Sequence, residues 1–153
     1  MKKDVLRLDK NFADEFCHLR MKLFSELGEI CEGQDISELK LLTEQYYLTH
    51  INKDLLCWGI LQDNSLVSIG SLCLFTRIPY AENPTGLEGY ILNVYTESNF
   101  RNCGFANQIL DCIIAYSKKQ GIKRLWLNSS AQGRRIYSEK GFVNKDNEME
   151  IFL

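Results

Sequence analysis

The feature that most constrains the fold of this chain is a strand-like run that leads through a short turn into an amphipathic helix. Residues 89–96, GYILNVYT, are rich in β-branched and aromatic side chains, as buried strands are. The expected helix carries an apolar stripe formed by Ala106, Ile109, Leu110, Ile113 and Ile114. Gly121 stands where this helix should end, and a second strand-like run follows at 122–130. Two strands joined through such a helix are predicted to be parallel neighbours in one sheet.

The first third of the chain predicts two helices. Apolar residues recur at helical spacing over residues 14–30, where Gly28 is a candidate stop. A second helix is expected within residues 35–51, with Asp35 or Ser37 as its cap. The residues that share one face of this second helix are expected to be Leu41, Leu42, Gln45 and Leu48.

The rest of the chain predicts a hairpin, a loop and two short C-terminal elements. The apolar runs 55–62 and 66–75 flank the polar turn DNS, which indicates a β-hairpin. Residues 77–89 hold both prolines of the chain and are expected to form a loop. The last two elements are a short helix at 133–141, closed by Gly141, and a strand at 148–153. The resulting order, α-α-β-β followed by β-α-β-α-β, predicts an α/β or α+β fold with a mixed sheet.

Charge and composition narrow the classes of function. The 153 residues include 18 Lys and Arg against 20 Asp and Glu, a balance that does not favour binding to nucleic-acid phosphates. No apolar run approaches the roughly 20 residues of a membrane span, and the N-terminus lacks the apolar stretch of a signal peptide. Six cysteines without a C-x-x-C spacing predict reduced thiols rather than a zinc site or a disulfide framework. We therefore expect one cytoplasmic domain, residues 1–153, with no metal, membrane or nucleic-acid partner.

The turn between the strand and the helix, RNCGFA at residues 101–106, has the features of an anion site. The first N–H groups of a helix lack partners within the helix and lie at the positive end of its dipole. Phosphates bind there without help from a cationic side chain. Gly104 allows a ligand to approach the backbone closely, and the small Ala106 permits close packing. The pattern R-x-x-G-x-A is weak by itself, but the chain contains neither G-x-x-x-x-G-K-[ST] nor G-x-G-x-x-G.

The block GYILNVYTESNFRNCGFANQIL, followed by RLWLNSSAQGRRIYSEKGF, resembles the GCN5-related N-acetyltransferase (GNAT) family. The two N-terminal helices, the hairpin, the strand–turn–helix block and a terminal Y-x-x-x-G-F piece come in the family's order over essentially the whole chain. The pairing of R-x-x-G-x-A with a tyrosine ahead of GF is much more specific than either part. This resemblance implies a GNAT-like α/β (α+β) fold, with a mixed central sheet flanked by helices. It also implies an enzyme that transfers an acetyl group from acetyl-CoA to an amine by direct attack in a ternary complex.

The resemblance further implies which residues bind acetyl-CoA. Its pyrophosphate is expected on the backbone amides of Arg101, Asn102, Cys103, Gly104, Phe105 and Ala106. A bulge near LNVY splays this strand from the next, and the pantetheine arm then bonds to the exposed main chain of Leu92, Asn93, Val94 and Tyr95. Asn128 is either a further partner of the pantetheine arm or a turn former at a strand end. Family members often have glycine and a basic residue where this chain has Asn102 and Cys103, and Cys103 is either a reactive thiol or an inert loop residue.

The resemblance places three groups in the chemistry. Tyr137 is implied as the general acid for the departing thiolate, since a phenol with a pKa of about 10 keeps its proton at neutral pH. The N–H of Val94 is the implied donor to the thioester carbonyl. Glu88, six residues before Val94, matches the place of a glutamate base in the histone-acetylating branch of the family, where it acts directly or through water.

Alternatives stay open at this point. The same fold can serve as a non-catalytic acyl-CoA-binding sensor or interaction domain. A cysteine-dependent hydrolase with His18 or His50 would lack a recognised nucleophile motif. The residues that either recognise a cationic acceptor or are simply solvated are Glu26, Glu29, Glu32 and His50. The acceptor is expected to be a small-molecule or peptide amine, and the chain to be a monomer or homodimer.

Overall fold

The computed structural model describes residues 2–153, and its centre is one five-stranded sheet. The strands are β1 (Leu6–Arg7), β2 (Leu55–Gln62), β3 (Ser65–Thr76), β4 (Leu87–Thr96) and β5 (Arg124–Trp126). They lie in the order β1-β2-β3-β4-β5, and each neighbouring pair is antiparallel except β4 and β5, which are parallel. The predicted mixed sheet and its parallel pair are therefore confirmed.

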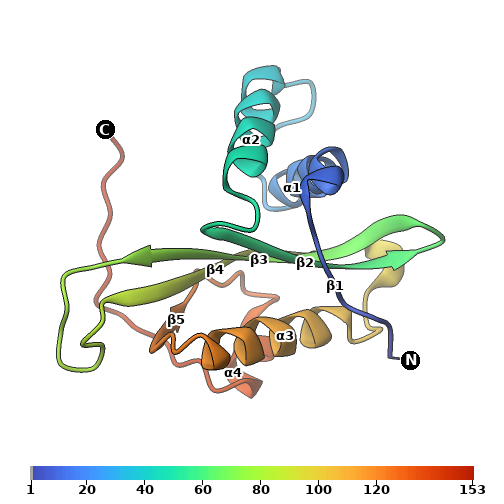
Figure 1. Ribbon diagram of the computed structural model, residues 1–153. Coiled ribbons are helices and arrows are strands. Elements are labelled where there is room, and N and C mark those ends of the chain that lie inside the picture. The colour runs from blue at the N-terminus through green and yellow to red at the C-terminus, as the bar shows by residue number, and fades with distance from the viewer. Residues whose placement is uncertain (1) are drawn as a thin grey trace.

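Helices cover both faces of this sheet (Figure 1). They are α1 (Ala13–Glu26), α2 (Ser37–His50), α3 (Phe105–Lys119) and α4 (Arg134–Glu139), with the 3-10 turns η1 (Lys10–Phe12) and η2 (Ser98–Phe100). α1 and α2 lie on one face, and α3 and α4 on the other. Because both faces are covered, β2 is buried along most of its length and shows no alternation of buried and exposed residues. None of these helices is long and apolar enough to cross a membrane.

Two apolar clusters fill the space between the sheet and its helices. In the first, Tyr47 of α2 packs on Phe16 of α1 with ring centroids 4.5 Å apart, and its hydroxyl donates to the carbonyl of Asp9 at 2.6 Å. The second contains the buried residues of α3, including Phe105, Ile109, Leu110 and Ile113. The stripe predicted for this helix is thus confirmed, with Ala106 and Ile114 at its half-buried edges.

β2 and β3 form the predicted hairpin through a tight turn. Its two central residues, Asp63 and Asn64, have φ values of 51° and 63°. Two consecutive positive φ values are typical of a type I′ turn, whose twist matches that of paired strands. Asp and Asn enter this left-handed region more readily than most other residues, which is why the sequence DNS closes the hairpin.

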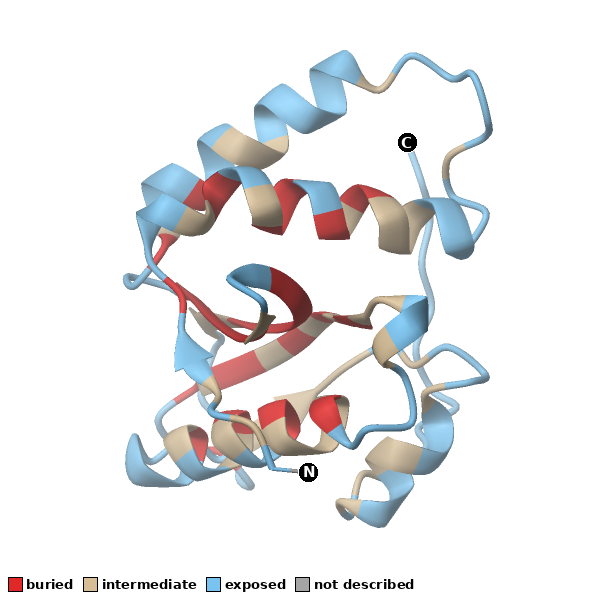
Figure 2. Ribbon diagram, turned by 90° about the vertical axis from the view of Figure 1, so that its right-hand side faces the viewer, coloured by how far each residue is buried: buried red, intermediate tan, exposed pale blue. Residues whose placement is uncertain are grey.

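The four residues predicted to share a face of α2 do lie on one side of the helix, but this side is not the one that packs on α1. Leu41, Leu42 and Leu48 are 55%, 53% and 48% exposed and Gln45 is exposed as well, whereas Tyr47 is buried. Figure 2 shows that most of α2 is exposed beside the more deeply buried α1. Apolar residues occur on several sides of this helix, so spacing alone does not decide which side packs on α1. The predicted cap was wrong, because α2 begins at Ser37 with Ile36 at the N-cap position and no side chain caps it. The Asp35 carboxylate accepts from the N–H of Ser37 at 3.0 Å, one residue before that position.

Two C-terminal predictions were also wrong. β5 covers only Arg124–Trp126 instead of 122–130, and residues 148–153 form no strand. Met149 and Ile151 are 95% and 80% exposed along an extended tail (Figure 1). The alternating run EMEIFL is typical of a strand, but a strand needs a partner, and the three residues of β5 offer only a short edge. The short helix ahead of Gly141 is confirmed as α4.

Gly70 of β3 allows α3 to lie close to the sheet. A Cβ at this position would stand 2.5 Å from Cγ2 of Ile109, a separation at which two carbon atoms repel strongly. We therefore expect Gly70→Ala to lower the free energy of unfolding, measured by urea denaturation, by about 1–3 kcal/mol.

An Ile109→Ala background is the control, because it removes the methyl group that the new Cβ would meet. Gly70→Ala should be less destabilising in the Ile109→Ala protein than in the wild type. Equal losses in the two backgrounds would mean that the effect arises in the strand itself and not in its contact with α3.

Candidate active site

A β-bulge lies near the middle of β4. Between Leu92 and Tyr95 the register with β3 shifts, so that Asn93 and Val94 together stand opposite the single residue Gly70. Asn93 has a φ of 57°, a left-handed conformation that asparagine adopts more readily than most residues. Such an extra residue interrupts the hydrogen-bond ladder and bends the strand. The bulge predicted within LNVY is therefore confirmed.

β4 and β5 separate just before this bulge. Their parallel pairing begins at Glu88 with Arg124 and stops at Tyr90 with Trp126. β4 continues to Thr96, so beyond residue 90 its main chain has no strand partner on this side within the described chain. An unpaired strand edge can bind another extended chain through main-chain hydrogen bonds. The four residues predicted to contact the pantetheine arm lie along this unpaired edge.

The turn after β4 presents free backbone donors. Asn102 and Gly104 have φ values of 63° and 78°, and α3 begins at Phe105. The N–H of Arg101 faces the carbonyl of Ser98 at 3.4 Å, but in residues 2–153 we find no protein acceptor for the N–H groups of residues 102–107. These donors lie at the positive end of a 15-residue helix, where anions bind favourably. Residues 101–104 are exposed, so a phosphate can reach them.

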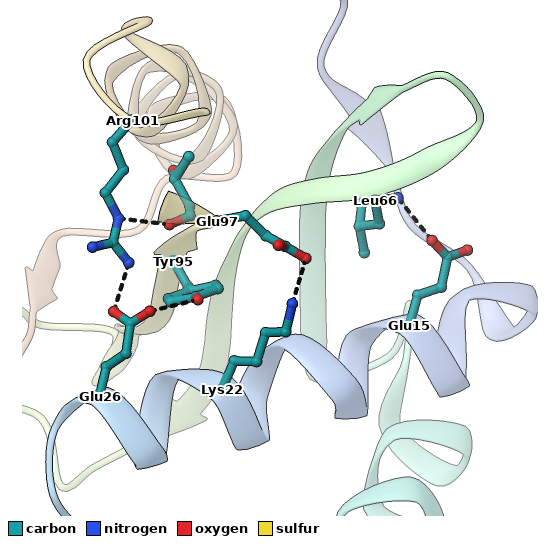
Figure 3. A network of polar contacts seen from close by, with 8 residues as sticks. Glu15, Lys22, Glu26, Leu66, Tyr95, Glu97 and Arg101 are labelled. Atoms are coloured by element: carbon teal, nitrogen blue, oxygen red, sulfur yellow. Dashed lines mark hydrogen bonds and ion pairs between the residues drawn. The ribbon is translucent and has the colours of Figure 1, made fainter. Parts of the chain in front are cut away.

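The side chain of Arg101 joins this turn to α1 (Figure 3). Its Nη2 lies 2.5 Å from Oε2 of Glu26, the last residue of α1, and its Nε donates to the Thr96 carbonyl at 2.9 Å. The hydroxyl of Tyr95 donates to the other Glu26 oxygen at 2.8 Å. Partial burial acts to raise the pKa of Glu26, but the bonds from Arg101 and Tyr95 hold it below its ordinary value. Glu26, a sequence candidate for acceptor recognition, is thus bound to a residue 75 positions away, which no local pattern indicates.

Glu88 is fully buried at the start of β4 and surrounded by donors. Its Oε1 accepts from Arg124 at 2.9 Å and lies 3.5 Å from Arg77. Its Oε2 accepts from the hydroxyl of Tyr80. Burial acts to raise the pKa of this carboxyl, but the hydrogen bonds from Tyr80 and Arg124 outweigh it and hold the pKa below its ordinary value. Six residues of strand, or about 20 Å, separate Glu88 from Val94, and this distance together with the lowered basicity weighs against a base at Glu88.

Tyr137 lies on α4, in the wall of a groove of about 700 Å³ beside β5. Its ring is half-buried and meets that of Phe142 edge-on, with centroids 6.0 Å apart. Burial, with a smaller contribution from Tyr90, raises the pKa of Tyr137 to about 12, so the phenol is protonated at neutral pH. Asn128 lines the same groove, but β5 ends at Trp126, so Asn128 lies two residues beyond the strand.

A smaller cavity, of about 220 Å³, lies on the face of the sheet that α1 and α2 cover. Its apolar walls are formed by Phe16, Leu42, Leu55 and Leu92. Its polar lining includes Arg20 of α1 and Asn93 of the bulge. Because Leu92 and Asn93 belong to β4, this cavity reaches the bulged segment from the side opposite to α3. Sequence reasoning missed Arg20, since the residues around it come from separate elements and share no motif.

The remaining sequence candidates make other contacts. His50 Nδ1 lies 2.7 Å from Oδ1 of Asp54, and the His50 ring stacks on Tyr46 with centroids 4.1 Å apart. In residues 2–153 no cysteine sulfur makes a hydrogen bond to a histidine, which does not favour a cysteine hydrolase. Cys103 is exposed in the turn ahead of α3. Glu29 and Glu32 line neither the cavity nor the groove.

The bulged strand, its separated neighbour and the free donors ahead of α3 are the features that the sequence resemblance predicted. The model of the Acetyltransferase (GNAT) family matches residues 14–142. The chain therefore belongs to the GNAT acetyltransferase family. As a member of this family it is an acetyl-CoA-dependent N-acetyltransferase, which confirms the fold, the class of enzyme and the cofactor expected from the sequence.

Solved structures with the same fold cover almost the whole chain. A predicted acetyltransferase from Clostridium acetobutylicum, solved with acetyl-CoA, is 25% identical over 99% of this chain and 96% of its own, with a TM-score of 0.86. A GCN5-related N-acetyltransferase from Ralstonia eutropha JMP134 is 17% identical over 99% of both chains, with a TM-score of 0.85. Glucosamine-6-phosphate N-acetyltransferase from Arabidopsis thaliana is 17% identical over 99% of both, with a TM-score of 0.74. A comparison with curated protein sequences gives no match.

Removing the charge of Glu88 should destabilise the protein. Glu88→Gln leaves Arg124 and Arg77 without their carboxylate partner, so we expect the free energy of unfolding at about pH 7 to fall by about 1–3 kcal/mol. Since the folded-state pKa of Glu88 is lowered, its stabilising contribution is complete above the unfolded value of 4.5 and is lost as the pH falls through the folded value. Urea denaturation of both proteins should therefore show that their stabilities converge below pH 4.5. If the difference in free energy of unfolding between the wild type and Glu88→Gln stays constant through this pH range, Glu88 does not stabilise the fold through its charge.

Proposed function

We propose that this enzyme transfers the acetyl group directly to a primary amine of a small molecule or peptide, with acetyl-CoA and the amine bound at the same time. The observation that carries the proposal is the bulge of β4, because two openings meet there. The unpaired edge of β4 faces the gap toward β5, and the 220 Å³ cavity reaches the bulge from the side of α1 and α2. Two ligands can therefore approach one main-chain segment from different sides, as direct transfer requires.

The backbone of the chain is suited to acetyl-CoA. The free N–H groups of residues 102–106 would bind its pyrophosphate, and the main chain of residues 92–95 would pair with its pantetheine arm. Asn102 adopts the left-handed conformation without the glycine that the family often has there, so the turn keeps its donors available. Acetyl-CoA supplies an acyl group that is activated as a thioester. The N–H of Val94, which lies outside the paired residues of β3 and β4, would donate to the carbonyl oxygen of that group.

Tyr137 is the proposed donor to the sulfur that leaves. Its pKa of about 12 keeps the phenol protonated at neutral pH, so the Tyr137 hydroxyl can donate a hydrogen bond to the sulfur. The same value makes the phenol a weaker acid than a thiol, whose pKa is about 8.5. The contribution of Tyr137 is therefore a hydrogen bond that stabilises the departing thiolate, more than a complete proton transfer. Asn128, in the same groove, is a further candidate partner of the pantetheine arm.

The proton of the acceptor amine passes to water in this proposal. Among residues 2–153 no aspartate or glutamate lines the acceptor cavity. Glu88 accepts from Arg124 and Tyr80 and lies far along β4 from the bulge. We therefore propose that Glu88 has a structural role: it joins the start of β4 to β5 and to the loop before β4. It does not take the proton of the amine.

The role of the turn can be tested at the two ends of α3. Gly104 and Gly121 have φ values of 78° and 71°, and an added Cβ at either position meets no atom closer than 4.0 Å. Alanine should therefore cause a similar backbone strain at both, about 1–2 kcal/mol. Only Gly104→Ala should weaken acetyl-CoA binding in calorimetry, by about tenfold or more, because its Cβ would stand beside the phosphate donors. Equal affinities of Gly104→Ala and Gly121→Ala would exclude this turn as the phosphate site.

Tyr137→Phe tests the donor to the sulfur. Phenylalanine keeps the ring that packs on Phe142, so the fold should be unaffected. We expect kcat to fall by about 10- to 100-fold, with little change in the KM for acetyl-CoA, because the lost hydrogen bond acts mainly in the transition state. Steady-state kinetics with any accepted amine gives both constants. An unchanged kcat would remove Tyr137 from the chemistry.

A further inference from the structure

We propose that the 220 Å³ cavity binds an acceptor amine that also carries a carboxylate, as a small amino acid does, and that Arg20 recognises this carboxylate. The inference rests on the proposed function, because that function places the acceptor in this cavity. Its basis is the guanidinium of Arg20 and the carboxamide of Asn93, which lie side by side in a largely apolar wall.

Arg20 is a half-buried cation that has no carboxylate oxygen within 4.0 Å in the part of the chain that the structure describes, although Glu29 is close enough to act on its charge. In residues 2–153 four other arginines lie within 4.0 Å of a carboxylate oxygen, namely Arg77, Arg101, Arg124 and Arg135, and Arg20 does not. Its guanidinium lies 4.5 Å from the ring centroid of Phe24 and donates to Oδ1 of Asn93 at 3.4 Å. A guanidinium has five N–H donors, so most of those on Arg20 are available to a ligand. An anion with two oxygens, such as a carboxylate, fits this planar group best.

Asn93 provides a second donor at the same place. Its side chain is among the buried polar groups, at 5% exposure, and its Nδ2 has no hydrogen-bond partner within the described chain. The amide oxygen faces Arg20, since a guanidinium only donates. An unpaired buried N–H is unfavourable, and a ligand oxygen that accepts from it removes that penalty. A carboxylate next to Arg20 provides such an oxygen.

The rest of the cavity disfavours polycationic and large acceptors. Arg20 is the one charged residue in its lining within residues 2–153, so a polycationic amine would meet a like charge without a compensating carboxylate. Its volume is below the roughly 300–1,000 Å³ typical of ligand pockets, which favours a compact molecule. Phe16, Leu42 and Leu55 offer apolar contact to the body of that molecule. The cavity thus combines one anion site with an apolar wall next to the bulge where the amine must arrive.

The first experiment measures release of the CoA thiol with matched acceptors. A panel of α-, β- and γ-amino carboxylates is compared with the carboxamide of each compound, which differs only in charge. We expect kcat/KM of the wild type to favour the best acid over its amide by about tenfold or more. In Arg20→Met, which keeps the length and apolar stem of the side chain, this preference should disappear, while the KM for acetyl-CoA stays unchanged.

Lys22→Met is the matched control. Lys22 lies on the same helix and carries the same charge, but it pairs with Glu97 at 3.0 Å and does not line the cavity. If the preference for acids comes from Arg20 and not from the general charge of α1, Lys22→Met should keep it. Loss of the preference in both variants would overturn the assignment to Arg20.

A second experiment needs no turnover. Calorimetry in the presence of CoA measures the affinity of the same acids and amides for the wild type and for Arg20→Met. Acids that bind the wild type more tightly than their amides, with the difference lost in Arg20→Met, would support the proposal even if no amine is acetylated. Such binding without acetylation would contradict the proposed transfer to an amine and would still support the proposed anion site. Equal affinity or equal turnover of acids and amides would overturn the anion site and leave the transfer to amines intact.

Discussion

The extra residue in β4 is the constraint on which the rest of the structure depends. With Asn93 and Val94 opposite Gly70, β4 leaves the regular ladder at its centre while it stays paired to β3 at both ends. On one side the strand loses β5 as a partner, and on the other its bulged segment becomes part of a cavity wall. Gly70 has no side chain, so α3 can lie close to the sheet beneath the bulge. Both openings of the candidate active site thus border this one irregular segment.

Features with local signals could be predicted from the sequence. The run of β-branched and aromatic residues, the turn with Gly104 and the apolar stripe before Gly121 each depend on neighbours within a few positions, and β4, the turn and α3 agree with them. The DNS turn closed its hairpin for the same reason. The bulge was expected only through the family resemblance. Nothing in the letters LNVY distinguishes a bulged strand from a regular one, although an asparagine within a strand is consistent with a left-handed residue.

Features that depend on distant contacts could not be predicted. Glu88 was a candidate base from its position in the chain, but the sequence could not show the environment of this side chain, which is set by Arg124, 36 residues away. The packing of α2 was missed because Tyr47 and not a leucine fills the contact with Phe16. Arg20 carries no signal at all, since an arginine on a helix is most often solvated. What distinguishes it is that it is half-buried and has no carboxylate oxygen within 4.0 Å in the described chain, which becomes visible only when the surrounding elements are assembled.

Helix α1 has contacts with both candidate ligand sites at once. Arg20 lines the cavity, and six residues later Glu26 holds the side chain of Arg101 at the turn ahead of α3 (Figure 3). Any ligand that shifts one of these contacts acts on a helix shared with the other site. The two binding equilibria are then linked, and the linkage is reciprocal: the factor by which acetyl-CoA changes the affinity for the acceptor equals the factor by which the acceptor changes the affinity for acetyl-CoA. A preferred order of binding would therefore reflect rates and concentrations, because the free energy of the ternary complex is the same by either route.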